Sequence, residues 1–266
     1  MPIGAVLGFN TLNDYRFPRR IPPILTKGMA KSMKNEKQTI GIIHAVNLTI
    51  RAMQPFLDRY IPDVSVMHLC DDTIQRDNIA AGPGKIPKRN YFRFAQYAHN
   101  LEESGVELIL LACSTFNYAA ELARPMIDIP IMQIDRPMME LAVEQGPRVG
   151  LLATLATTVP SSERLLRIVA AEKERPVEIT KVLRPEAFQA IQRGDVAAHN
   201  EILLEEIRQL SGKVDSIVLA QLSMSALEPL LHDTAVPVYN SGTTGFARIR
   251  EMLEETRQPV AQEAAI

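Results

Sequence analysis

The sequence repeats itself: three segments of its first half return in the same order in its second half. IGIIHAVNLTI, from residue 40, resembles VGLLATLATTV, from residue 149. VELILLACST, from residue 106, resembles DSIVLAQLSM, from residue 215, and DIPIMQID, from residue 128, resembles AVPVYNSG, from residue 235. Matched residues are 109, 108 and 107 positions apart (150 − 41, 219 − 111 and 237 − 130). This nearly constant spacing predicts a duplicated fold with two similar lobes related by a pseudo-two-fold axis.

Each half alternates short apolar segments with amphipathic ones. In the first half we expect strands at 39–46, 64–70, 106–114 and 130–135, and helices near 48–60, 88–104 and 117–124. Uninterrupted apolar strands are typical of parallel sheets covered by helices on both faces. The sequence therefore predicts an α/β protein of two pseudo-symmetric lobes, each a parallel sheet flanked by helices, with the active site in the cleft between them.

The predicted lobes cover most of the chain. We expect lobe one at 39–146, which a C-terminal helix at 243–255 could complete, and lobe two at 147–242. Residues 1–38, rich in Pro, Lys and Arg, are expected to form an N-terminal arm, either a solvated lead-in or an arm that stabilises an oligomer. Residues 256–266 are expected to form a tail.

The composition favours a soluble protein that binds small molecules. Of the 266 residues, 46% are hydrophobic and 23% are charged, and the formal net charge is −2. This charge gives no electrostatic reason to expect nucleic acid or a membrane surface as a partner. No segment approaches the roughly 20 apolar residues of a membrane span, and no signal peptide is recognisable, so we expect a cytoplasmic location.

Polar residues gather where the predicted strands end. Ligands of open parallel sheets bind beyond the carboxyl ends of the strands, so two facing lobes would enclose a cleft lined by these residues. The candidate site residues are His44, Asn47, Cys113, Ser114, Thr115 and Asn117 from lobe one, and Thr154, Thr157, Thr158, Gln221 and Ser223 from lobe two.

Cys113 is the candidate catalytic residue. It follows the apolar run LILLA at a predicted strand-to-helix turn, where backbone N–H groups and the helix dipole are expected to lower the thiol pKa. A thiolate there would act as a base or a nucleophile. The alternative is that Cys113 is a small buried hydrophobic residue. The hydroxyl and amide side chains directly after it favour the first interpretation, because they suit a carboxylate ligand.

The other candidates also have two interpretations. Thr154, Thr157 and Thr158 place hydroxyls at a second predicted helix start, where they would bind an anion or simply cap the helix. His44 ends a strand and would be an acid, a base or a donor to substrate, or else a structural residue.

Several other features argue against a metal or a nucleotide. The two cysteines, Cys70 and Cys113, are too few for a disulfide framework or a thiolate zinc site. Cys70 precedes two aspartates that should raise its pKa, and we expect a packed thiol; His68 is expected to pack in the core or at the sheet edge. AAGPGKIP, from residue 80, lacks the spacing of a phosphate-binding loop and is expected to be a mobile loop near the cleft. We expect no cofactor and no metal.

At LLACST, LLATLATTVPS and IVLAQLSMSALEPLL the sequence resembles the aspartate/glutamate racemase superfamily. This superfamily includes cofactor-independent amino-acid and hydantoin racemases, maleate isomerases and arylmalonate decarboxylases, and the resemblance runs from about residue 39 to 253. It implies one cysteine in each lobe, on opposite faces of the substrate α-carbon, one removing the proton as the other returns it. Cys113 matches the first cysteine, Ser114 and Thr115 match the substrate-binding residues beside it, and the three threonines of lobe two match its carboxylate cradle.

The sequence departs from the superfamily pattern at two positions. Gln221 stands where the second cysteine is expected, and an amide cannot serve as the second base. His44 stands where amino-acid racemases commonly have an aspartate, and Ser223 or His44 would have to replace the missing base.

The resemblance implies an enzyme that works without pyridoxal phosphate. We expect a racemase or isomerase that transfers a proton at the α-carbon of a small carboxylate through Cys113, and a homo-oligomer. The first alternative is a single-cysteine decarboxylase or another C–C lyase. The second alternative is a non-catalytic protein that binds a small carboxylate.

Overall fold

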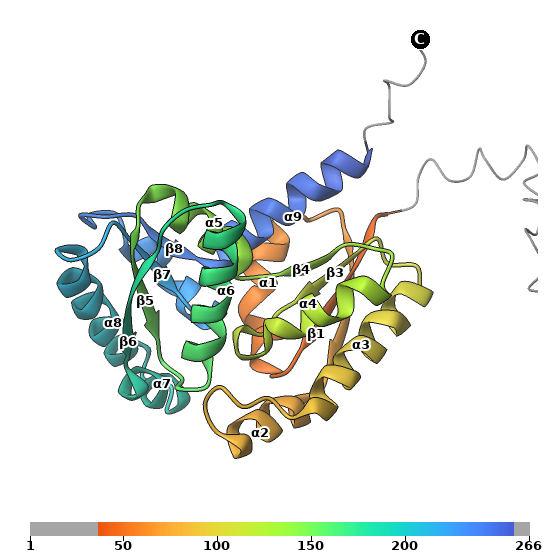
Figure 1. Cartoon of the computed structure of the whole chain (residues 1–266), viewed down its shortest axis with the longest axis horizontal. Coiled ribbons are helices and arrows are strands. Elements are labelled where there is room, and N and C mark those ends of the chain that lie inside the picture. The colour runs from red at the N-terminus through yellow and green to blue at the C-terminus, as the bar shows by residue number, and fades with distance from the viewer. Residues whose placement is uncertain (1–36, 258–266) are drawn as a thin grey trace, which may run out of the picture. The chain divides into compact units, whose positions relative to one another are not determined.

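The structure, a computed structural model, describes residues 37–257. In this range the chain forms two four-stranded sheets, each parallel throughout and flanked by helices (Figure 1). The first sheet has the order β2-β1-β3-β4 and the second has the order β6-β5-β7-β8. The predicted fold class, an α/β protein with two similar lobes, is confirmed.

The first sheet is built from β1 (Thr39–His44), β2 (Ser65–Cys70), β3 (Leu108–Leu111) and β4 (Ile131–Gln133), and the second from β5 (Arg148–Ala153), β6 (Glu178–Leu183), β7 (Ser216–Leu219) and β8 (Val238–Asn240). The α-helices are α1 (Leu48–Tyr60), α2 (Asp72–Ala81), α3 (Lys88–Glu103), α4 (Tyr118–Ala123), α5 (Arg136–Gln145), α6 (Thr158–Glu172), α7 (Pro185–Gln192), α8 (Val196–Ser211) and α9 (Ser241–Arg257). Three 3₁₀ helices complete the described chain: η3 (Ser114–Phe116), η4 (Arg124–Met126) and η5 (Leu222–Leu230).

The two sheets have the same register, which explains the repeat in the sequence. Ile43 of β1 lies beside Leu111 of β3, and Leu152 of β5 lies beside Leu219 of β7. These pairs are separated by the same offsets, 109 and 108 residues, as the matched segments of the sequence. Positions counted forward from the paired residues are therefore structurally equivalent in the two lobes.

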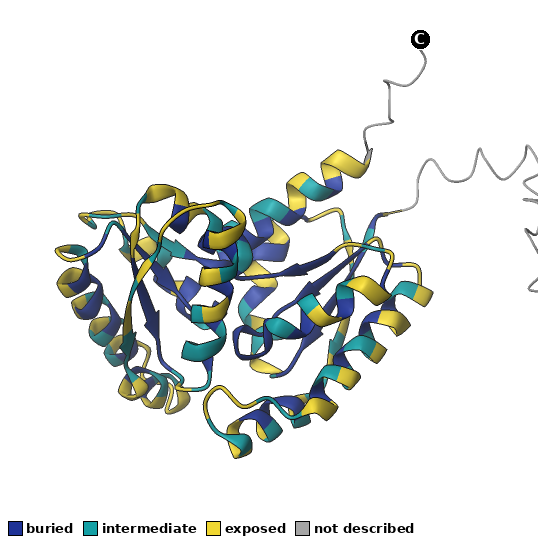
Figure 2. Cartoon of the chain, in the orientation of Figure 1, coloured by how far each residue is buried: buried dark blue, intermediate teal, exposed yellow. Residues whose placement is uncertain are grey.

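Alternating side chains of each strand pack on opposite faces of the sheet. Ile40 and Ile42 of β1 pack with α1 and α9, whereas Ile43 packs with α3 and α4. All three are at most 1% exposed, and burying a side chain of this size stabilises a fold by about 1.5–3 kcal/mol. Figure 2 shows the sheets buried and the outer faces of the helices exposed. Burial on both faces is why the strands read as continuous apolar runs.

Two helices pack on the lobe that does not precede them in the chain. α5 follows β4, but Met138 and Met139 pack in the core of the second sheet. α9 follows β8, but Phe246 and Ile249 pack against the first sheet, beside α1 (Figure 1). The boundary predicted at residue 146 therefore places α5 in lobe one, whereas its packing places it in the core of lobe two.

The predicted ends of the chain are described only in part. The proposed arm (residues 1–38) lies outside the described residues except for Lys37 and Gln38, and most of the proposed tail (256–266) lies outside them as well. Thr256 and Arg257 still belong to α9. No helix within residues 37–257 combines the length and the apolar character that a membrane span needs.

The prediction that Cys70 is a packed thiol is wrong. Cys70 and His68 both lie on β2, an edge strand, and both are exposed. The pKa of the Cys70 thiol is raised, first by partial burial and then by the charges of Asp72 and Asp71, in the direction that the sequence predicts. The order of strands in a sheet decides which strand is at the edge, and the strand pattern alone does not contain that order.

Candidate active site

A cavity of about 350 Å³ lies between the two lobes, at the carboxyl ends of their strands. Residues that follow β1, β3, β5 and β7 contribute to its wall, together with α2 and α7. This is the edge at which parallel sheets bind ligands. The polar residues that line the cavity are Thr49, Gln75, Cys113, Ser114, Thr115, Thr158, Gln192, Gln221 and Ser223.

The cavity wall has the pseudo-symmetry of the fold. Cys113 lies two residues beyond Leu111 and Gln221 two residues beyond Leu219, so the thiol and the carboxamide are equivalent. The same offset of 108 relates Thr115 to Ser223, and the offset of 109 relates Thr49 to Thr158. Each lobe therefore presents the same three positions to the cavity, and the pair that differs most in chemistry is the thiol and the amide.

The structure brings six of the eleven predicted site residues to the cavity. These are Cys113, Ser114, Thr115, Thr158, Gln221 and Ser223. The other five do not line it: His44, Asn47, Asn117, Thr154 and Thr157. Three of these five form a hydrogen bond with a residue of the cavity wall or with the neighbour of one: His44, Asn117 and Thr154.

The environment of Cys113 overturns the expectation of a lowered pKa. The side chain is only 9% exposed, and this burial raises the pKa of the thiol to about 12. The backbone N–H groups of Thr115 and Phe116 act in the predicted direction and lower it, but the charge of Asp135 raises it further. The loss of hydration thus outweighs the donors of the turn, and at neutral pH the resting residue is a protonated thiol.

Asp135, which the sequence analysis did not single out, is a buried carboxyl group close to Cys113. It follows β4 and is fully buried, and its Oδ2 atom accepts a hydrogen bond from Asn117 Nδ2 at 2.9 Å. Burial raises the pKa of Asp135 to about 6, although hydrogen bonds from Asn117, Ser114 and Ser241 oppose this rise. Asn117 is therefore a support of the carboxyl group behind the cavity wall and not a group that meets the ligand.

Gln221 is held in a defined orientation by Thr154. Its Oε1 atom accepts hydrogen bonds from the backbone N–H of Thr154 at 2.6 Å and from the hydroxyl of Thr154 at 2.9 Å. A backbone N–H only donates, so the atom that faces it has to be the amide oxygen. The Nε2 group, for which no described residue supplies an acceptor, is left as a donor for a ligand in the cavity.

A direct hydrogen bond joins the two lobes at the cavity wall. The hydroxyl oxygens of Thr115 and Thr158 lie 3.2 Å apart, and both residues are buried. Thr115 lies in η3 and Thr158 starts α6, the helices that follow β3 and β5. Their contact fixes the distance between the two strand ends that bound the site.

His44 lies behind the cavity wall, with none of its surface exposed. Its Nδ1 atom lies 2.7 Å from the hydroxyl oxygen of Thr49, and its Nε2 atom lies 2.9 Å from Nδ1 of His68. Burial and the nearby His68 lower the pKa of His44 to about 4. His44 therefore does not meet a ligand directly but contacts Thr49, which does line the cavity.

Two further predicted residues have no contact with the cavity. Asn47 precedes α1 and is exposed, and Thr157 precedes α6 with a buried hydroxyl that has no partner among the described residues. Neither side chain makes the hydrogen bond of a helix cap. The anion-binding role predicted for the lobe-two threonines is thus left to Thr158.

Among the described residues that line the cavity, Cys113 is the only side chain that ionises. The donors and acceptors around it are neutral hydroxyls and amides, and Gln75 Oε1 is buried without a partner. Within residues 37–257 no group of three His, Cys, Asp or Glu side chains is placed to hold a metal ion. The chemistry of this wall is therefore that of one thiol and several neutral hydrogen-bonding groups.

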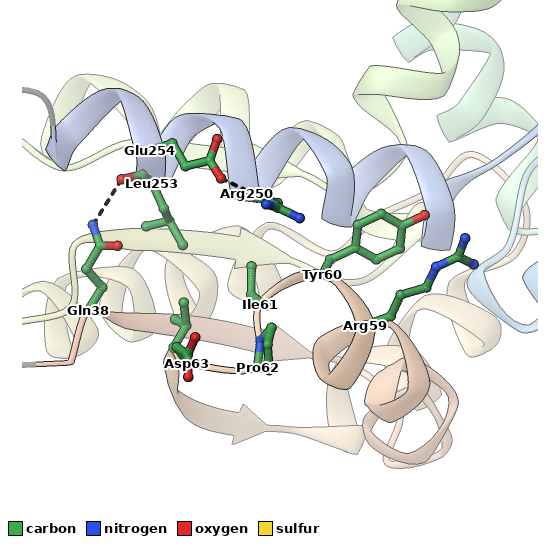
Figure 3. A pocket seen from close by; sticks show the side chains of 10 residues that line it. Gln38, Arg59, Tyr60, Ile61, Pro62, Asp63, Arg250, Leu253 and Glu254 are labelled. Atoms are coloured by element: carbon green, nitrogen blue, oxygen red, sulfur yellow. Dashed lines mark hydrogen bonds and ion pairs between the residues drawn. The ribbon is translucent and has the colours of Figure 1, made fainter.

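A smaller hollow of about 200 Å³ lies at the opposite edge of the first sheet. It is bordered by Gln38 and Val64, which precede β1 and β2, and by α9 (Figure 3). Its charged residues are largely engaged with neighbours, as the ion pair of Arg250 with Glu254 shows. The amino ends of parallel strands do not form ligand sites of this fold, so this hollow is not the candidate active site.

Thr49 and Asp135 were missed by the sequence analysis for different reasons. The repeat already contained a signal for Thr49, since the offset of 109 residues maps it onto Thr158. Asp135 ends the segment PIMQID, and nothing in the sequence says that the chain returns at this point to the end of β3. Gln75 and Gln192 lie on helices that flank the cavity and carry no motif.

Comparison with known proteins identifies the family. The profile of the family described as Asp/Glu/hydantoin racemase matches residues 49–249. A glutamate racemase of Trichodesmium erythraeum (strain IMS101) is 29% identical over 138 residues, 49% of each chain. A glutamate racemase of Lactococcus lactis subsp. cremoris (strain MG1363) is 24% identical over 161 residues, 58% of each chain. The chain thus matches about half to three-fifths of the length of these relatives.

Solved structures show the same fold. A glutamate racemase isoform of Bacillus anthracis has a TM-score of 0.62 at 14% identity, covering 84% of both chains. The allantoin racemase of Klebsiella pneumoniae has a TM-score of 0.58 at 16% identity, covering 83% of this chain and 89% of the other. The glutamate racemase of Francisella tularensis in complex with D-glutamate has a TM-score of 0.59 at 17% identity, covering 83% and 82%. With the two lobes and the strand-end cavity, the profile match leads to one conclusion: this chain belongs to the Asp/Glu/hydantoin racemase family.

Proposed function

We propose that the protein is a racemase or isomerase that works without a cofactor and moves a proton at the α-carbon of a small carboxylate through Cys113. The observation that carries this proposal is the position of Cys113, which among the described residues is the only ionising side chain in the wall of the cavity between the lobes. The racemases named above, which share the fold, support the reaction class.

The hydrogen-bonding groups of the cavity suit a carboxylate and its enolate-like state. Gln221 Nε2 and the hydroxyl of Ser223 are neutral donors of the cavity wall, and the hydroxyls of Thr49 and Thr158 line the same space while bonded to Val46 and Thr115. Donors fixed in place stabilise developing negative charge on an oxygen without having to reorganise during the reaction. The described cavity wall has no carboxylate that would pair with a substrate ammonium group, so we expect binding to depend on the carboxylate end of the substrate.

The pKa of Cys113 determines which half-reaction the resting protein is ready for. At neutral pH the residue holds its proton, so it is ready to protonate a carbanion: the S–H bond breaks as the C–H bond forms. The thiolate that remains is stabilised by the N–H groups of Thr115 and Phe116. The reverse step, removal of a substrate proton, regenerates the thiol.

Hydrogen exchange with solvent tests the proposal. The protein is incubated in D₂O with D- and L-glutamate, D- and L-aspartate, allantoin and phenylmalonate, and deuterium at the α-carbon is followed by NMR. We expect exchange with at least one compound, and a loss of about 10²-fold or more in Cys113→Ser, which removes the acid–base group. Cys70→Ser, a change of the exposed cysteine outside the cavity, is the matched control and should exchange at the wild-type rate.

The outcome also separates the alternatives. Deuterium that enters only as carbon dioxide is released from phenylmalonate would identify a decarboxylase. Binding of these compounds without any exchange would identify a binding protein. Exchange that continues at the same rate in Cys113→Ser would overturn the role of the thiol.

A further inference from the structure

A chain of hydrogen bonds leads from the protein surface to the cavity through two imidazole rings. His68, on the exposed edge strand β2, places Nδ1 2.9 Å from Nε2 of the buried His44. His44 places its Nδ1 2.7 Å from the hydroxyl oxygen of Thr49, a residue of the cavity wall. The rings are 5.1 Å apart between centroids and tilted by 39°, as suits an in-plane hydrogen bond better than stacking.

The hydrogen bond from Thr49 to Val46 sets the direction of the other hydrogen bonds in the chain. The Thr49 hydroxyl lies 2.6 Å from the carbonyl oxygen of Val46, which only accepts, so the hydroxyl hydrogen points to Val46. The Thr49 oxygen then accepts from Nδ1–H of His44. With its proton on Nδ1, His44 accepts at Nε2 from Nδ1–H of His68. The donors thus run in one direction from the surface, and the last of them, the Thr49 hydroxyl, donates to the backbone carbonyl of Val46 at the cavity wall.

Thr49 differs from the other hydroxyl groups of the cavity. Its pseudo-symmetry partner Thr158 bonds to Thr115 of the other lobe, and no histidine within residues 37–257 bonds to either. Among the described residues of the cavity wall, Thr49 alone bonds to an imidazole. One hydroxyl of a symmetric pair is therefore linked by hydrogen bonds, through His44, to an imidazole on the exposed edge strand.

We propose that Thr49 is the second proton-transfer residue of the site and that His44 and His68 position its hydroxyl and renew its proton from solvent. This inference rests on the proposed function. Gln221, the equivalent of Cys113 in lobe two, cannot act as an acid or base, so Thr49 supplies the second group from lobe one, beyond the strand that pairs with the strand of Cys113.

The proton balance of the step is complete within the three residues. The Thr49 hydroxyl first turns from the carbonyl of Val46 to the substrate carbanion, and its O–H bond then breaks as a C–H bond forms. The proton on His44 Nδ1 moves to the Thr49 oxygen, and the proton on His68 Nδ1 moves to His44 Nε2. A His68 that began as the imidazolium ends as the neutral ring with its proton on Nε2, and water restores the lost proton. Abstraction of a substrate proton runs the same steps in reverse.

Three His68 variants and one control separate a relay from a structural contact. His68→Gln keeps an N–H donor for His44 but cannot pass a proton on, and His68→Ala leaves a gap at the surface that exogenous imidazole can fill. His99→Ala removes an exposed histidine of α3, outside the chain of hydrogen bonds, as the matched control. His68→Asn is a second amide variant, whose side chain is one methylene group shorter than that of His68→Gln. The rate measured is deuterium exchange with the compound of the panel that the wild-type protein exchanges fastest.

We expect His68→Ala and both amide variants to lose about 10²-fold in kcat with KM unchanged, as for removal of a general acid–base group. Added imidazole should restore His68→Ala and have no effect on His68→Gln or on the control. An amide variant at the wild-type rate, or a His68→Ala that imidazole does not restore, would overturn the relay.

Two further outcomes keep the relay distinct from the proposed function. ¹⁵N NMR of the histidine side chains should show His44 as the neutral ring protonated on Nδ1, and a ring protonated on Nε2 would overturn the relay without any substrate. If the wild-type protein exchanges none of the six compounds, the proposed function fails and the relay fails with it. If Cys113→Ser abolishes exchange but the His68 variants do not change it, only the relay is wrong.

Discussion

Cys113 and Gln221 occupy the same position in the two lobes, each two residues beyond the last paired residue of its strand, and both line the cavity. One is a thiol and the other is a carboxamide whose oxygen is fixed by Thr154. A symmetric backbone thus carries an asymmetric pair of side chains. The two proton-transfer residues that we propose, Cys113 and Thr49, therefore both come from lobe one, and lobe two contributes the amide of Gln221.

Gln221→Glu tests whether the amide group of Gln221 donates to the ligand. The variant keeps an oxygen for the Thr154 N–H but replaces the Nε2 donor with a second acceptor that carries negative charge. We expect KM for an anionic substrate to rise by about 10-fold or more, because one hydrogen bond to a charged group contributes about 1.5–3 kcal/mol. Steady-state kinetics measure this. An unchanged KM would show that the ligand does not use this donor.

Asp135→Asn should make Cys113 easier to ionise. The charge of Asp135 raises the thiol pKa, so its removal should lower that pKa from about 12. The rate of iodoacetamide alkylation against pH, in a Cys70→Ser background, reports the pKa of Cys113 alone. Asp128→Asn, a change of an exposed aspartate, is the control and should leave the alkylation profile where it was. A profile that does not move in Asp135→Asn would contradict the coupling.

His44→Gln should make the fold less sensitive to acid. In the unfolded chain His44 takes up a proton near its ordinary pKa of 6.5, whereas in the fold it stays neutral down to about 4. Stability is therefore lost as the pH falls through this window, by about 3 kcal/mol at 1.36 kcal/mol per pH unit. Urea denaturation at neutral pH and at pH 4 should show a smaller loss in the variant. His99→Gln should follow the wild-type curve.

Gly242→Ala should loosen the attachment of α9. A Cβ atom at this position would lie 2.5 Å from the ring of Phe56 on α1, closer than real contacts allow, and the buried ring has little room to move. We expect a loss of about 1–3 kcal/mol of unfolding free energy from overpacking. Gly212→Ala is the control, since its Cβ meets nothing within 4 Å. Equal stability of the two variants in chemical denaturation would refute this account.

The repeat made much of the fold and part of the site predictable. The resemblance predicts Gln221 at the position of the second cysteine, and because both lobes keep one register, counting from the matched segments gives the same equivalence of Cys113 and Gln221. The same counting would have found Thr49 from Thr158. Periodicity also located α1 at residues 48–60. Local sequence contains these features, since each depends on a strand and the few residues after it.

The remaining features depend on contacts between distant segments. His44 ends its strand at the predicted place, but strand order puts β2 beside it, so the ring meets His68 and not the cavity. The pKa of Cys113 depends on burial by both lobes and on Asp135, which returns from β4. The N–H groups of such a turn lower the pKa of a thiol near the surface. When the surrounding chain buries the thiol, the loss of hydration raises the pKa by more than the turn lowers it. The local sequence around Cys113 therefore cannot predict whether burial or the N–H donors decide the pKa of the thiol.

α5 and α9 each pack on the lobe that does not precede them, and this limits the ways in which a ligand can reach the cavity. Moving the two lobes apart would remove Met138 from the core of the second sheet and Phe246 from the core of the first sheet. Opening the cavity in this way would expose the apolar cores of both lobes. The exchange of α5 and α9 thus holds the two lobes of the described chain together. We therefore expect a ligand to enter past Leu48 and Ile79, which line the cavity and have about half of their surface exposed.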